Sequence, residues 1–176
     1  MILKGFREKS NKKYFDKLLV NRKISNVSKP IESLGVIVNI DEFSNLEALK
    51  SIAKLLNINP SKFQLITFTT SIPNKESEDN LSFSSKDIGW SGKIKNGELD
   101  AFLNTNFDAL ISYYFTDNLD LKMLTAISKA DFKIGVLQEE QRQNDLIIKV
   151  NPDAIEVFKT ELLKYLSILK RIKKDE

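Results

Sequence analysis

The sequence predicts an α/β protein with a three-layer, Rossmann-like or flavodoxin-like fold, in which a mainly parallel sheet of five to six strands follows a basic N-terminal helix. From residue 34 onward, short apolar runs alternate with amphipathic segments, as in a parallel sheet covered by helices on both faces. The run 35–40, GVIVNI, is apolar and β-branched, which is typical of a strand buried on both faces. A chain of 176 residues is long enough for one such domain. We expect residues 1–29 to form a basic helical arm with its linker, and residues 30–176 to form a single α/β domain.

The expected strands are the apolar runs, and the expected helices are the segments of helical spacing between them. Ser44 and Glu47 form a capping box before the second helix. Asn151, as N-cap, and Pro152 predict the start of the last helix. The strands are expected at 35–40, 63–69, 107–112, 132–137 and 146–150, with an edge strand near 81–83. The helices are expected at 2–24, 44–58, 97–104, 119–130 and 151–172.

The residue types exclude several kinds of chemistry. The chain contains no histidine and no cysteine. Triads based on these residues and the usual zinc sites are therefore excluded. Carboxylate, lysine or tyrosine acid–base chemistry remains, as does Mg²⁺ or Ca²⁺ bound by oxygen atoms. The composition favours a non-catalytic protein, and we expect no catalytic residue, no cofactor and no metal.

The hydropathy pattern predicts a cytoplasmic protein without a transmembrane segment. The longest apolar run, 34–40, is far shorter than the roughly 20 residues that cross a bilayer. The basic N-terminus lacks the apolar stretch and cleavage site of a secretory signal. The absence of cysteine offers no disulfide framework that would argue for export.

Positive charge is concentrated at the start of the chain. Residues 1–29 contain nine basic and only two acidic side chains, with Phe6, Tyr14 and Phe15 interleaved. A polar run at 7–13 interrupts the apolar stripe, so we expect only the second half of this helix to pack on the body. Such a surface suits phosphate groups, on RNA or on an anionic membrane, and the alternative is a solvated lysine-rich helix. The candidate nucleic-acid contacts are Lys4, Arg7, Lys9, Lys12, Lys13, Arg22, Lys23, Lys170 and Arg171.

Polar residues follow the strands of the predicted sheet, where open α/β folds bind their ligands. Asp41 is the best candidate there for an acid–base or metal-binding carboxylate. The alternative is that these residues cap helices and form turns. The candidate pocket residues are Asp41, Thr69, Thr70, Tyr114, Thr116, Asp117 and Asn118.

The segment 89–93, GWSGK, does not have the spacing of a phosphate-binding Walker loop. We interpret it as a tight turn with Trp90 folded onto the body, while an exposed Trp90 would be a contact residue.

The stretch 107–137, FDALISYYFTDNLDLKMLTAISKADFKIGVL, resembles the strand–helix–strand of the N-terminal, acceptor-side domain of heptosyltransferase-type glycosyltransferases. There an "fDxxIdl" strand precedes a helix that ends near "SxAxxKIG". The resemblance implies a Rossmann-like half without the second, nucleotide-sugar domain of those enzymes. The layout of ILKGFREKSNKKYFDKLL at the start and TAISKADFKIG later resembles a small uncharacterised bacterial family of unknown function, which implies no activity.

These observations lead to one principal functional hypothesis and two alternatives. The principal hypothesis is a non-catalytic, Rossmann-like module that docks through its basic N-terminal helix on a larger protein or ribonucleoprotein assembly. An RNA-containing partner such as the ribosome is the first choice. The first alternative is a small sugar- or nucleotide-handling enzyme domain that uses Asp41 with Mg²⁺. The second is a peripheral protein on an anionic membrane surface.

Overall fold

The computed structural model shows six strands, all parallel, in the order β3-β2-β1-β4-β5-β6. It describes residues 2–24, 28–71 and 81–173. This strand order is that of Rossmann folds, in which ligands bind where the order reverses, between β1 and β4. The predicted fold class is confirmed. The strands are β1 (Leu34–Asn39), β2 (Phe63–Phe68), β3 (Leu81–Phe83), β4 (Ala109–Tyr113), β5 (Phe132–Gly135) and β6 (Leu146–Ile147).

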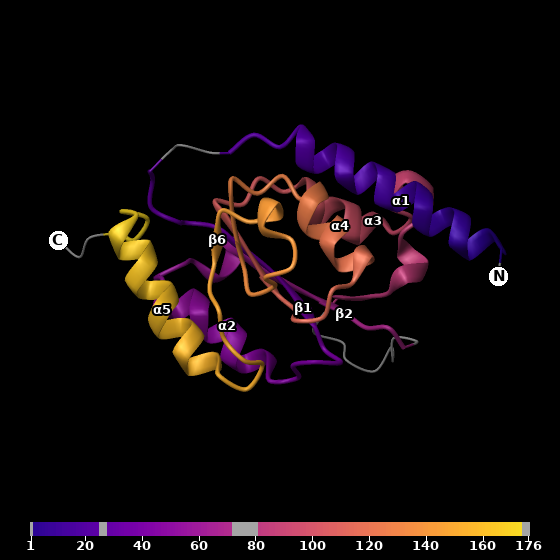
Figure 1. Ribbon diagram of the computed structural model, residues 1–176. Helices are drawn as coiled ribbons and strands as arrows, with labels where there is room; N and C mark the ends of the chain where they lie inside the picture. The colour runs from indigo at the N-terminus through magenta and orange to yellow at the C-terminus, as the bar shows by residue number, and fades with distance from the viewer. Residues whose placement is uncertain (1, 25–27, 72–80, 174–176) are drawn as a thin grey trace.

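Helices cover both faces of this sheet (Figure 1). On one face α2 and α5 pack through side chains such as Leu49, Phe158 and Leu162, which share a core with alternate residues of β1 and β4. On the other face α3, α4 and α1 share the second core, which contains Phe15 and Leu121. The helices are α1 (Ile2–Val20), α2 (Leu46–Leu55), α3 (Gly97–Asn104), α4 (Leu119–Ile127) and α5 (Ile155–Ile168).

Local hydrogen bonds move several element ends away from the predicted positions. Asn45, not Ser44, caps α2, because its side chain accepts the Ala48 N–H at 3.2 Å. Residues 151–154 form a turn, closed by the Ala154 N–H on the Asn151 carbonyl, so α5 begins at Ile155 and Asn151 is not its cap. β4 begins at Ala109. The side chain of the preceding residue, Asp108, accepts the Ser33 N–H at 3.0 Å.

α1 is attached to the body along more of its length than the interrupted stripe predicts, because Arg7 in its first half also bonds to the body. Asn11, Phe15 and Leu19 recur every four residues and are buried. Their partners are α4 and the 89–93 turn, which contains the short helical turn Trp90–Gly92. Because a four-residue spacing keeps side chains on one side of a helix, this stripe fixes which side of α1 faces outward.

Candidate functional site

Asp41 follows β1 at its carboxyl end, and both of its carboxylate oxygens accept hydrogen bonds from the protein although the residue is exposed. It accepts the Thr69 and Thr70 hydroxyls and the Thr70 N–H, each at 2.7 Å. Partial burial acts to raise the pKa of Asp41, but the hydrogen bonds from Thr70 and Thr69 outweigh it and hold the pKa below its usual value. Asp41 therefore ties the ends of β1 and β2 together and is a poor proton acceptor.

Glu42 links the ends of β1 and β4, where the strand order reverses. Its two carboxylate oxygens accept the N–H groups of Phe115, at 2.8 Å, and Thr116, at 2.7 Å. These two backbone donors follow β4, at the edge where a Rossmann fold presents N–H groups to an anionic ligand. The Glu42 carboxylate thus accepts the hydrogen bonds that these donors would otherwise offer to an anionic ligand.

Of the remaining strand-end candidates, Thr70, Asp117 and Asn118 line one cavity, whereas Thr69, Tyr114 and Thr116 are not among its lining residues. Tyr114 is fully buried, and its hydroxyl bonds Thr125 at 2.7 Å and Gln143 at 3.1 Å, so it lies in the core. Burial raises the pKa of Tyr114 well above its usual value. Thr69 is buried as well, whereas Thr70, Thr116 and Asp117 are exposed and Asn118 caps α4 by accepting the Leu121 N–H.

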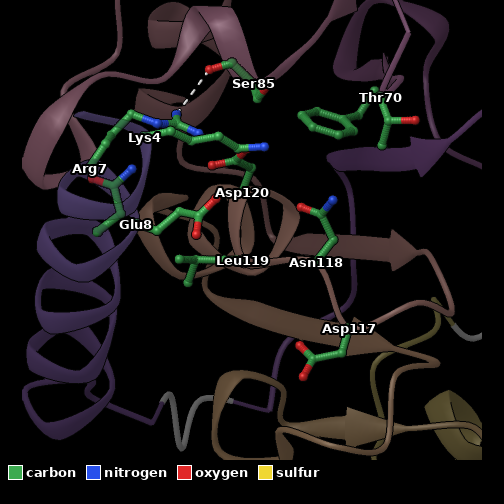
Figure 2. Close-up of a pocket in the computed structure, with 11 residues that line it drawn as sticks. Lys4, Arg7, Glu8, Thr70, Ser85, Asp117, Asn118, Leu119 and Asp120 are labelled. Carbon is green, nitrogen blue, oxygen red and sulfur yellow. Dashed lines mark hydrogen bonds and ion pairs between the residues drawn. The ribbon is translucent and has the colours of Figure 1, made fainter. Parts of the chain in front are cut away.

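A cavity of about 410 Å³ lies between the start of α1 and the strand ends. Figure 2 shows Lys4, Arg7 and Glu8 of α1 beside Asn118, Leu119 and Asp120 of the α4 start. Charges of both signs line it, so it has no consistent preference for an anion or a cation. Within the described residues, no three acidic, histidine or cysteine side chains come together as a metal site requires.

Arg7 points inward at this cavity. Its guanidinium donates to the backbone carbonyls of Ser85, at 3.2 Å, and Ile88, at 2.9 Å, and pairs with Asp120 at 3.7 Å. Burial raises the pKa of Asp120, and the Arg7 charge opposes that rise. Arg7 therefore fastens the first half of α1 to the 85–88 segment.

The other candidate arginines also point inward. Arg22 pairs with Asp145 at 2.6 Å, and both side chains are largely buried. Arg171 is buried with its guanidinium 4.1 Å from the centre of the Phe132 ring. The prediction that these three arginines offer surface charge to a nucleic acid conflicts with this placement. Arginine suits such inward positions because its planar fork makes several hydrogen bonds at once.

The candidate lysines face solvent, though not on one surface. Lys4, Lys9, Lys13 and Lys23 are exposed near α1, and Lys12 pairs with Asp16 of the same helix. Lys170 is exposed beyond α5, and the end of α5 lies on the opposite side of the molecule from the start of α1 (Figure 1). The predicted C-terminal contribution therefore belongs to a separate surface.

The outer side of α1 has a regular row of lysines that we call the lysine stripe: Lys9, Lys13 and Lys17. The four-residue spacing places them about 6 Å apart along the helix. Beside them lies a groove of about 740 Å³, which Tyr14 and Ser91 also line. Lys17 was not among the predicted contacts, although the spacing of the stripe is visible in the sequence.

Trp90 lies next to Ser91 in the 89–93 turn, and 49% of its surface is exposed. Trp90 is thus only half covered by the body, and its exposed half is available as a contact surface, while the Tyr14 ring packs against Gly92. The longer segment 86–95, which contains this turn, exposes further lysines, which sequence reasoning missed because only the fold brings the segment beside α1. They are Lys86, Lys93 and Lys95.

Over residues 7–169, the sequence matches the model of a family of unknown function, DUF6913. The chain belongs to this family. The predicted membership of an uncharacterised family is thereby confirmed, whereas the likeness to heptosyltransferases is not. No curated protein matches the sequence. Because DUF6913 is a family of unknown function, membership implies no activity. Among the described helices, none combines the length and the apolar character needed to cross a bilayer.

Proposed function

We propose that the protein is a non-catalytic binding module that docks on RNA or an RNA-containing assembly through the outer side of α1. The observation that carries the proposal is the lysine stripe, held on a helix whose other side is locked into the core. Phosphate contact by lysines supplies most of the affinity in non-specific binding of nucleic acids.

The two sides of α1 differ in a way that supports this proposal. Arg7 and the buried row Asn11, Phe15 and Leu19 face the body. Positions 9, 13 and 17 are displaced by two residues from that row, which turns them about 200° around the helix axis. The lysines are therefore presented on a fixed surface instead of a disordered arm, and less conformational entropy is lost on binding.

The strand ends support a non-catalytic role. The two carboxylates that could serve an enzyme at this edge, Asp41 and Glu42, each accept hydrogen bonds from the protein itself. Their carboxylates are accordingly used to fix the strand ends.

A titration with a fluorescently labelled, single-stranded 12-nucleotide RNA tests the proposal by anisotropy at several salt concentrations. For single strands the slope of log Kobs against log salt is about −0.7 for each phosphate neutralised. The triple variant Lys9→Gln, Lys13→Gln, Lys17→Gln should reduce that slope by about 2 and weaken binding at low salt.

A charge-matched control uses three lysines of α2 and α5, which cover the other face of the sheet: Lys54→Gln, Lys159→Gln and Lys164→Gln. This control should leave the slope near that of the native protein. Equal losses in the two triple variants would show a general charge effect and defeat the proposal.

The exposed apolar residues of the first turns favour a second candidate function, attachment to an anionic membrane. Ile2 is 77% exposed, Leu3 72% and Phe6 54%. A helix with lysines and exposed apolar side chains can lie in a membrane interface. Flotation with vesicles containing phosphatidylserine separates the two functions: flotation without RNA binding favours the membrane and overturns the first proposal.

A further inference from the structure

We infer that Trp90 is a base-stacking platform for single-stranded RNA, placed beside the lysine stripe. This inference rests on the proposed function and adds the kind of RNA and the residue that contacts its bases. It is argued from the rigidity of the 89–93 turn, the exposure of Trp90 and the charges around it.

The turn is held rigidly against α1. The buried side chain of Asn11 accepts the Gly92 N–H at 3.2 Å, and the Ser10 and Ser91 hydroxyls bond at 2.9 Å. Within the turn, the Gly89 N–H donates to the Lys93 carbonyl at 2.7 Å. The backbone on either side of Trp90 is thus held at a defined position relative to α1.

The backbone of the turn adopts an unusual conformation next to Trp90. Ser91 has a φ of 50°, in the left-handed region that non-glycine residues seldom adopt. Gly92 follows with a φ of 70°, and a Cβ there would collide with the Tyr14 ring. Two consecutive left-handed residues turn the chain sharply while Tyr14 fills the space beneath it. Trp90 is left half exposed instead of packing in the core.

The surroundings of Trp90 match a polyanion with exposed bases. Ser91, which follows Trp90, joins the lysine stripe in lining the 740 Å³ groove, and Lys93 at the end of the turn and Lys95 beyond it are exposed. A positively charged groove with an aromatic side chain is the arrangement that binds single strands, since bases stack on the ring while lysines contact phosphates. In a duplex the bases are already stacked on one another, so none is free to stack on the Trp90 ring.

Trp90 is the single tryptophan of the chain, so its intrinsic fluorescence reports this contact alone. We expect unlabelled 12-nucleotide single-stranded RNA to quench it on titration, and a 12-base-pair RNA duplex to quench it much less. Trp90→Leu should weaken single-strand binding by about 5- to 150-fold, the range for losing one base stack, while Trp90→Phe should retain most of the affinity.

The outcomes separate this inference from the proposal on which it rests. Salt-dependent RNA binding with unchanged tryptophan fluorescence, and equal affinity for Trp90→Leu, would overturn the stacking role and leave the lysine stripe intact. Equal quenching by duplex and single strand would overturn the choice of single-stranded RNA. An absence of binding by the native protein at low salt would remove the proposed function itself. A control variant, Val157→Ala in α5, should bind like the native protein, because this exposed residue lies on the other face of the sheet.

Discussion

Lys133 offers a quantitative test of the geometry around β5 and the end of α4. It is only 5% exposed, and its ammonium donates to the Ala126 carbonyl at 3.2 Å. Burial lowers the pKa of Lys133 to about 8, with a further lowering from the Arg22 charge and an opposing effect of Asp145. In the unfolded chain the same amine titrates near its ordinary value, about 10.5.

The sign and size of the effect follow from these two pKa values. Between pH 8 and 10.5 the unfolded chain holds a proton that the folded protein has released, so raising the pH stabilises the fold. Below pH 8 both states are protonated, and the full cost of burying the charge is present. From pH 7 to pH 10 this one group should raise the free energy of unfolding by about 2–3 kcal/mol.

Lys133→Met removes the charge and keeps an unbranched side chain, so it isolates this contribution. Urea unfolding of both proteins at pH 7, 8, 9 and 10 gives the difference in free energy of unfolding at each pH. That difference should move in favour of the native protein by about 2–3 kcal/mol as the pH rises. A difference that stays constant across this range would refute the burial of the Lys133 amine.

The attachment of α1 gives two further predictions. Phe15→Ala should lower the free energy of unfolding by about 3–5 kcal/mol, because Phe15 is fully buried. Phe6→Ala should change it little, because Phe6 is more than half exposed. Urea unfolding of both variants measures the two effects. Similar losses in the two variants would contradict the packing of α1 on α4. Gly92→Ala should cost at least about 1 kcal/mol by the same assay, since alanine at a positive φ is strained and its Cβ meets Tyr14. Gly5→Ala, in an exposed stretch of α1 with open space around the new Cβ, should instead be neutral or stabilising.

The fold could be predicted from the sequence because its signal is periodic. Runs such as GVIVNI mark buried parallel strands, and the alternation with helices leaves few topologies. The ends of the elements were harder to predict, since they depend on single hydrogen bonds, such as that of Asn45 with Ala48. The packing of α1 was hard to predict for a specific reason: its buried row begins with a polar residue, Asn11, whose partner is a backbone N–H 81 positions away.

The candidate site was predictable only in part. The basic character of the N-terminal helix is visible in the sequence, but the choice between inward arginines and outward lysines depends on distant partners, such as the Ser85 carbonyl for Arg7. The occupation of Asp41 and Glu42 likewise depends on Thr70 and Phe115, which neighbouring strands bring close. The half exposure of Trp90 could not be predicted, because the sequence does not show that Tyr14 packs against Gly92 in the same turn.

Photo-crosslinking is the most direct test of docking on RNA through α1. The native protein is irradiated with single-stranded RNA containing 4-thiouridine, and the crosslinked peptides are identified by mass spectrometry. The account predicts crosslinks in residues 9–17 and 86–95, with Trp90 prominent, and their loss in the lysine-stripe variant. Crosslinks confined to α2 and α5, or none under conditions where a known RNA-binding protein crosslinks, would contradict it.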